Sequence, residues 1–159
     1  MEIEPLADAL VREHHEIDDG IDAFAAGATA GDRDPSPLRT AIRELRRHIY
    51  FEEEFLFPLL REAGLVAPIF VMLREHGQIW DTLDALDRAV NIGDDVSMLC
   101  RQLAVQLQHH NLKEEKILYP QAEETLPAQE CGRLRELLAV SEPPPGWTCE
   151  RAGAGGAQR

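Results

Sequence analysis

The sequence predicts an all-α fold: an antiparallel up-down four-helix bundle with a short extra C-terminal helix and a disordered tail. Apolar residues recur at steps of three, four or seven over four long stretches, which is typical of amphipathic helices. Segments rich in Gly, Asp and Pro separate these stretches. No alternation typical of a strand competes with them, so the four apolar faces are expected to share one core.

The boundaries of the helices follow from local start and stop signals. Pro5 suits the first turn of a helix, where its missing N–H is not needed. The segment GATAGDRDPSP (27–37) has no helical periodicity and is expected to be a loop. Gly64 offers a stop for the second helix, and NIGDD (91–95) ends the third and caps the fourth. The expected long helices cover residues 5–26, 37–62, 68–90 and about 96–120.

Two prolines disturb the hydrogen-bond pattern of the predicted helices. Pro58 and Pro120 lie late in the second and fourth helices, and a proline inside a helix cannot donate the i→i−4 hydrogen bond. Both helices are therefore expected to bend there or to stop a turn later.

A short fifth helix is expected over 127–140. The domain is expected to span 1–140, and the Pro/Gly-rich tail 141–159 has too little apolar content to pack, which predicts disorder.

Length and composition limit the class of protein and its partners. The 159 residues suffice for one domain with a proper core. The formal net charge of -13 argues against nucleic acid and anionic membranes as partners and favours cations. Cys100, Cys131 and Cys149 have no CxxC spacing and suggest reduced thiols. With no signal peptide and no long apolar run, the protein is expected to be soluble and cytoplasmic.

One motif occurs twice, as HIYFEEEFLFP (48–58) and HNLKEEKILYP (110–120). Both copies have the form H-x-x-x-E-E-x-x-L-x-P. Four residues are about one helical turn, so the histidine and the first glutamate of each copy share a helix face. The offset of 62 residues (110 minus 48) also aligns REH at 12–14 with REH at 74–76. The bundle is therefore expected to consist of two copies of a helix pair.

The offset selects six polar residues that interrupt the apolar stripes. His15 and His109 align with Gly77 and Arg47, so neither neighbour has a matching histidine, and both are expected in solvent or beside the ligands. Glu53 recurs as Glu115 but lies about 100° round the helix from the first glutamate, so it is also expected in solvent or beside the ligands. The selected residues are His14, His48, Glu52, His76, His110 and Glu114.

These six residues predict a metal site. A buried carboxylate without a partner costs several kcal/mol, whereas imidazoles and carboxylates bind iron, manganese or zinc well. A lone histidine on an apolar stripe is usually a hydrogen-bonded core residue, and a run of three glutamates is usually a solvated face. The single repeat shared by all six residues favours two metal ions, with Glu52 and Glu114 between them and an open position for a small ligand. Ferritin-like di-iron bundles use the reverse order, Glu-x-x-His, and are disfavoured.

On the motifs beginning at His14, His48, His76 and His110, the chain resembles hemerythrin-like proteins of the HHE cation-binding family over about residues 6–121. The resemblance implies a non-haem di-iron centre, with an oxo or hydroxo bridge, in which Glu52 and Glu114 are bridging ligands. Oxygen-carrying hemerythrins have a further histidine where this chain has Trp80. The resulting four-histidine set resembles that of iron–sulfur cluster repair proteins, whose cysteine-containing N-terminal domain is absent from this sequence.

Three functions follow as expectations. The first is a binding protein for dioxygen, nitric oxide or a related small oxidant, acting in sensing, buffering or delivery, with a protein partner engaged through the tail at Trp147 and Cys149. The second is a di-iron enzyme acting on peroxide or nitric oxide, or an iron donor in cluster repair, with Tyr50 and Tyr119 as redox or hydrogen-bonding neighbours, although ordinary packing is the commoner role for both. The third is iron handling by loading and release. Manganese and zinc fit the same donor set.

Overall fold

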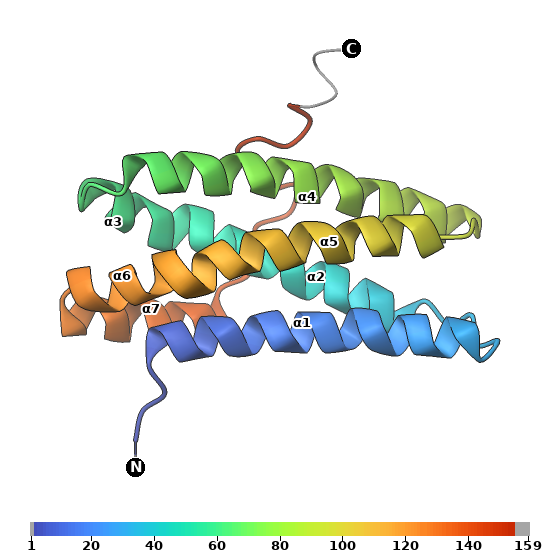
Figure 1. Cartoon of the computed structure of the whole chain (residues 1–159), viewed down its shortest axis with the longest axis horizontal. Coiled ribbons are helices and arrows are strands. Elements are labelled where there is room, and N and C mark those ends of the chain that lie inside the picture. The colour runs from blue at the N-terminus through green and yellow to red at the C-terminus, as the bar shows by residue number, and fades with distance from the viewer. Residues whose placement is uncertain (1, 155–159) are drawn as a thin grey trace.

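The computed structural model describes residues 2–154, which form helices and connecting segments without a strand. The all-α prediction is confirmed (Figure 1). Most helices begin and end within a few residues of the predicted bounds. The elements are α1 (Leu6–Thr29), α2 (Ser36–Phe51), η1 (Glu52–Leu56), α3 (Phe57–Glu62), α4 (Val66–Ile92), α5 (Ser97–Lys113), η2 (Glu114–Leu118), α6 (Tyr119–Thr125) and α7 (Ala128–Val140).

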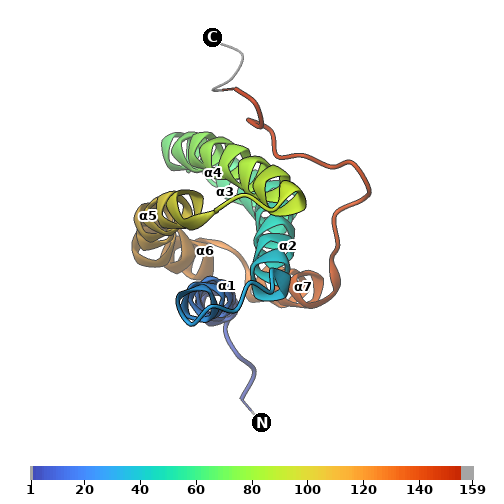
Figure 2. The same ribbon diagram turned by 90° about the vertical axis from the view of Figure 1, so that its right-hand side faces the viewer.

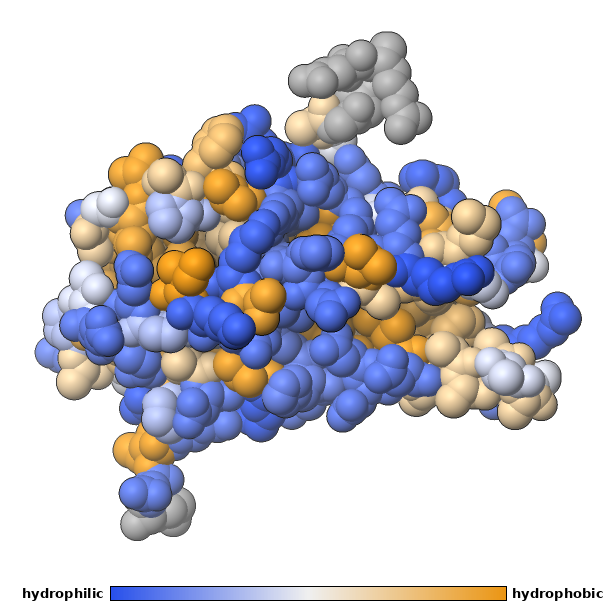
Figure 3. All heavy atoms as spheres, viewed as in Figure 1, coloured by the Kyte–Doolittle hydropathy of each residue, from blue (hydrophilic) through white to orange (hydrophobic). Residues whose placement is uncertain are grey.

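The longest helices pack side by side around a shared interior. α1 contacts α2 and α5, and α4 contacts the same two helices, so the four surround one core (Figure 2). α7 packs outside this group against α1, α2 and α6. The face seen in Figure 3 is mostly hydrophilic with scattered apolar patches, as expected for amphipathic helices. Within residues 2–154, no helix combines the length and the apolar character needed to cross a membrane.

The second and fourth predicted helices run through their prolines by means of a π-helical turn. The N–H of Phe57 donates to the carbonyl of Glu52, and the N–H of Tyr119 donates to the carbonyl of Glu114. These i→i−5 bonds shift the hydrogen-bond register just before Pro58 and Pro120, where an α-helical donor is missing. The helices therefore do not stop at the prolines. Each π turn begins at a predicted ligand, Glu52 or Glu114.

The apolar core is divided into two clusters with a polar layer between them. One cluster includes Ile17 and Leu107, and the other includes Leu10 and Leu118. Along α1, His14 lies between Leu10 and Ile17, and the other three predicted histidines occupy the same level in their own helices. The polar layer therefore crosses the middle of the bundle and has apolar packing on both sides.

The prediction of a disordered tail is wrong for residues 141–154. This segment has almost no regular structure, yet it packs on the bundle, and the side chain of Cys149 is only 2% exposed. Composition misled the prediction because the segment contributes few apolar residues, and backbone N–H groups that donate to carboxylates on the helices help to hold it. The last five residues of the predicted tail, 155–159, lie outside the described residues.

Candidate metal centre

The structure brings all six predicted ligands into the polar layer. α1 contributes a histidine, α2 with η1 and α5 with η2 each contribute a histidine and a glutamate, and α4 contributes the remaining histidine. None of the six residues is more than 3% exposed. The six residues are His14, His48, Glu52, His76, His110 and Glu114.

The four histidines form two pairs. The rings of His14 and His48 lie 4.7 Å apart between centroids, and the rings of His76 and His110 lie 4.8 Å apart. We call the His14–His48 pair the first half-site and the His76–His110 pair the second half-site. The first half-site takes both of its histidines from the first copy of the repeat, and the second half-site takes both from the second copy, so the two halves are related by the 62-residue offset (14 to 76, 48 to 110).

Both glutamates contact both half-sites. Glu114 places Oε1 3.2 Å from Nε2 of His14 and Oε2 3.2 Å from Nε2 of His110. Glu52 places Oε1 3.2 Å from Nε2 of His76 and 3.5 Å from Nε2 of His48. Two carboxylates thus lie between two pairs of imidazoles, an arrangement that suits a pair of cations sharing both carboxylates.

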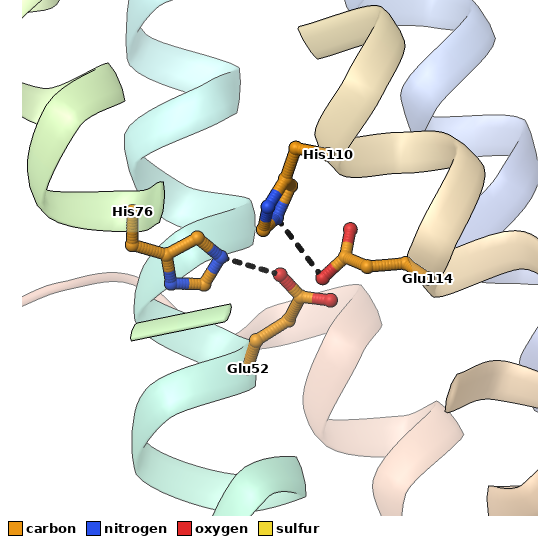
Figure 4. A group of neighbouring side chains, drawn as sticks. All are labelled: Glu52, His76, His110 and Glu114. Carbon is orange, nitrogen blue, oxygen red and sulfur yellow. Dashed lines mark ion pairs between the residues drawn. The ribbon is translucent and has the colours of Figure 1, made fainter. Parts of the chain in front are cut away.

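Unsatisfied buried atoms indicate that a cation fits the second half-site (Figure 4). Nε2 of His76 and Nε2 of His110 are buried and make no hydrogen bond, and the same holds for Glu52 Oε1 and Glu114 Oε2. The atoms face one another at 3.2 Å, within the range of an ion pair but not aligned as hydrogen bonds. Leaving such groups unpaired costs about 1–3 kcal/mol each. Two imidazole nitrogens and two carboxylate oxygens are a donor set that a divalent metal satisfies.

A second ring of four glutamates, which we call the outer carboxylates, fixes the histidines. Each accepts a hydrogen bond from one imidazole Nδ1, so that Nε2 faces the centre. Outer partners of this kind set the tautomer and orientation of a ligating histidine. The pairs are Glu115–His14 at 2.8 Å, Glu13–His48 at 2.9 Å, Glu53–His76 at 2.7 Å and Glu75–His110 at 3.0 Å.

Glu13 and Glu75 were not predicted to belong to the site. The signal was present, because both precede a predicted ligand in the repeated tripeptide REH, but helical periodicity turns each of them about 100° away from the neighbouring histidine. Each reaches instead a histidine on the next helix. Arg47 also pairs with Glu13, and Lys113 pairs with Glu75.

The ionisation of these groups follows from burial and pairing. Burial alone would raise the pKa of Glu75, but hydrogen bonds and charges from His110 and Lys113 outweigh it and lower the pKa to about 2. Burial alone would lower the pKa of His110, but the nearby Glu114 charge and the hydrogen bond to Glu75 raise it to about 10. Without metal, protonated imidazoles therefore supply the positive charge that the carboxylates require.

The two half-sites differ at one position. Tyr119 Oη lies 2.7 Å from Glu52 Oε2, 3.0 Å from His14 Nε2 and 3.2 Å from His48 Nε2. Burial, reinforced by the nearby glutamate charges, raises the pKa of Tyr119 well above its usual range, so its hydroxyl stays protonated. The repeat places Phe57 at the equivalent position, where it stacks on His76 at 5.4 Å.

The remaining candidates lie outside the ligand cluster. Tyr50 packs edge-on against Phe55 and Trp147, which is an ordinary packing role. The side chains of His15 and His109 are exposed, in agreement with the prediction. Trp80, which stands where oxygen-carrying hemerythrins have a further histidine, is 3% exposed and packs under the Arg46 guanidinium at 4.4 Å.

The comparison with protein families agrees with this geometry. The model of the hemerythrin HHE cation binding domain matches residues 5–122, a stretch that contains the six predicted ligands and the four outer carboxylates. No curated protein and no solved structure gives a match to the chain. The buried His/Glu cluster supports metal binding, and the resemblance inferred from the motifs is confirmed. The chain belongs to the hemerythrin HHE cation-binding domain family.

Proposed function

We propose that this protein is a non-haem di-iron protein that binds dioxygen, nitric oxide or a related small oxidant for sensing, buffering or delivery. The observation that carries the proposal is the sharing of both carboxylates by the two half-sites, because Glu114 directs one oxygen to His14 and the other to His110. In this proposal His14 and His48 would hold one iron ion, His76 and His110 would hold the other, and Glu52 and Glu114 would be shared by both.

The residues around the centre support ligand binding in a dry site. The apolar clusters on both sides of the polar layer exclude bulk water, and the outer carboxylates keep the imidazoles in place. The iron pair, when bound, supplies an electron source and a binding position for a small ligand. Tyr119 can donate a hydrogen bond at the first half-site, whereas Phe57 cannot do so at the second. A small ligand would therefore meet two different environments.

The position of Tyr119 favours one second candidate, a di-iron enzyme that acts on peroxide or nitric oxide. A neutral phenol 2.7 Å from a bridging carboxylate can hold or pass a proton during reduction of a small oxidant. Iron donation to damaged iron–sulfur clusters would use the same six candidate ligands and would need no proton from Tyr119. Manganese or zinc could occupy the same ligands.

We also propose an antiparallel up-down topology, a cytoplasmic location and a protein partner for this chain. Short connections between successive long helices support the antiparallel up-down arrangement of four helices. The three free cysteines support a reducing, cytoplasmic setting. A protein partner engaged through the C-terminal segment stays a prediction, and Cys149, one of the residues named for it, is buried against the bundle.

The decisive experiment combines elemental analysis with absorption spectroscopy. Two iron ions per chain are expected in protein purified from iron-supplemented cells, and the anaerobically reduced protein should change its ultraviolet–visible spectrum on addition of dioxygen or nitric oxide. An iron-loaded protein whose spectrum is unchanged by both ligands contradicts the binding function. Turnover of peroxide or nitric oxide identifies the enzyme, since a binder gives the spectral change without catalysis.

A further inference from the structure

The C-terminal segment 147–153 is fastened to the helices beside the second half-site. The indole N–H of Trp147 donates to Glu54 Oε1 at 3.0 Å, and the N–H of Gly153 donates to Asp81 Oδ1 at 2.9 Å. Between these points Cys149 is buried in the core cluster that contains Trp80. Figure 2 shows the chain passing from α7 along the outside of α2 to α4. The segment thus covers the α2 and α4 side of the bundle.

One hydrogen bond links this segment to a predicted metal ligand. The N–H of Glu150 donates to Glu53 Oε1 at 2.9 Å, and Glu53 Oε2 accepts from His76 Nδ1 at 2.7 Å. Both oxygens of this outer carboxylate are therefore engaged, one by the segment and one by the histidine. The Glu53 side chain is only 5% exposed. A carboxylate held at both oxygens cannot swing away, so His76 is held as well.

The repeat supplies an internal comparison, because Glu115 is the counterpart of Glu53. Glu115 binds Nδ1 of His14 at 2.8 Å, but its side chain is 30% exposed. It borders a pocket of about 410 Å³ that His15 and Leu112 also line. Within residues 2–154, the only hydrogen bond of the Glu115 carboxylate is the one to His14. The groove filled by the C-terminal segment on one side is thus open on the other.

We propose that residues 147–153 are a positioning element of the metal centre, which acts through Glu53 to hold His76 and so makes the metal ion of the second half-site the slower of the two to leave. A metal ion leaves when its ligands detach in turn, and a histidine with a fixed outer partner detaches less readily. Glu115 and His14 lack such a cover. This inference rests on the two-metal part of the proposed function.

Gly77 offers a way to displace the segment without touching a ligand. A Cβ at this position would lie 2.5 Å from the carbonyl oxygen of Arg151. Gly77 lies inside α4, where alanine is favoured over glycine, so Gly77→Ala should keep the helix and push the segment away. Gly132→Ala is the matched control: it lies inside α7, and its Cβ would meet only a flexible Arg135 side chain at 3.6 Å.

The first test measures metal release from the full chain loaded with Zn²⁺, which the same donors bind. A chromophoric chelator in excess should remove the two ions from the wild type in a fast and a slow phase. Gly77→Ala should accelerate the slow phase by about tenfold or more and leave the fast phase unchanged, since loss of an outer partner costs about 10–100-fold in affinity. Gly132→Ala should match the wild type. A single phase in the wild type, an unchanged slow phase in Gly77→Ala, or equal acceleration of both phases would overturn the proposal.

A double-mutant cycle tests whether the segment acts through Glu53. In a Glu53→Ala background, Gly77→Ala should add no further acceleration, because the connecting carboxylate is already gone. Multiplicative acceleration in the double variant would contradict the proposed connection.

A readout without metal separates this proposal from the proposed function. In the metal-free protein, the His76 Nδ1 proton should exchange with water about tenfold faster in Gly77→Ala than in Gly132→Ala, as measured by NMR. Equal exchange rates would refute the positioning role even if two metal ions bind. Conversely, a faster rate in a chain that fails to bind two ions would refute the di-iron function and retain the link from the segment to His76.

Discussion

At the scale of single residues, the proposed bridging role of Glu52 can be tested directly. Glu52→Ala removes oxygens that face His48 and His76, so we expect the metal content of the purified protein to fall from two ions to one or none. Glu62→Ala is the control, since Glu62 is exposed at the end of α3 and lies outside the polar layer. Elemental analysis gives the result. Retention of two ions by Glu52→Ala would exclude bridging by this residue.

The outer carboxylates should tune affinity without binding metal. Glu13→Gln weakens the bond that orients His48, and we expect metal affinity to fall by about 10–100-fold, as measured by competition with a chelator. Glu16→Gln is the control, because Glu16 lies on the exposed face of the same helix and pairs only with the exposed Arg12. This variant should keep its metal affinity within about twofold of the wild type. If Glu13→Gln binds metal as tightly as Glu16→Gln, the orienting role is wrong.

Tyr119 satisfies buried atoms of the first half-site when metal is missing. Tyr119→Phe leaves Glu52 Oε2 without its hydrogen-bond partner, while Nε2 of His14 and Nε2 of His48 keep each other at 3.1 Å. The unpaired carboxylate oxygen should destabilise the metal-free protein by about 1–3 kcal/mol. The loss should be smaller with metal bound, because the ion then satisfies the same atoms. Urea unfolding of both forms measures the difference. Tyr50 packs its ring against Trp147 outside the polar layer. Tyr50→Phe should therefore change the free energy of unfolding of either form by less than about 0.5 kcal/mol.

Among the elements, the end of α4 depends on one glycine. Gly93 has φ of 75° in the left-handed region, which ends the helix and starts the turn into α5. Gly93→Ala forces a Cβ into this conformation and should lower the free energy of unfolding by about 1–2 kcal/mol. Thermal or urea unfolding gives the value, with Gly132→Ala as control. Gly132 lies inside α7, where alanine should be neutral or slightly stabilising. Equal stability of Gly93→Ala and the wild type would contradict the capping role.

The two π turns show how an element can serve the site. In both copies the widened turn begins at a predicted ligand, Glu52 or Glu114, and ends two residues before the proline. The sequence predicted a disturbance at Pro58 and Pro120 but not its form. Several backbone solutions accommodate a missing donor, and packing of the helices around the polar layer selects among them.

For the molecule as a whole, charge predicts opposite responses of folding and metal binding to pH. The raised pKa of His110, about 10 against its usual 6.5, gives stability that is present below pH 6.5 and lost as the pH rises toward 10. The lowered pKa of Glu75, about 2 against 4.5, gives stability that is present above pH 4.5 and lost as the pH falls toward 2. The metal-free protein should therefore be most stable between about pH 4.5 and 6.5.

Metal binding should show the opposite trend above neutral pH. The ligating imidazoles must lose their protons, so affinity should rise as the pH increases from 6.5 toward 10, and loading should release protons. Urea unfolding of the metal-free protein across pH 3–10 and proton release followed with an indicator dye are the two measurements. Metal affinity that is independent of pH, or loading without proton release, would contradict protonated histidines in the metal-free site.

The sequence alone determined the helices, the repeat, the family and the six residues of the polar layer. Helical periodicity is local, so it assigns His14, His48 and Glu52 to interior faces without knowledge of their neighbours. Only the tertiary structure decided which partner each histidine meets. Glu13 reaches His48 and Glu53 reaches His76 because of the rotation and stagger of packed helices, which residue spacing does not encode.

The same distinction explains the C-terminal segment. Its composition indicated disorder because a stretch with few apolar residues cannot fold alone. Its place on the bundle depends on a groove and on carboxylates that exist only after α2 and α4 have packed together, including Glu53 for the N–H of Glu150 and Asp81 for the N–H of Gly153. Local patterns therefore determined the six candidate metal ligands, whereas long-range packing decided what holds them.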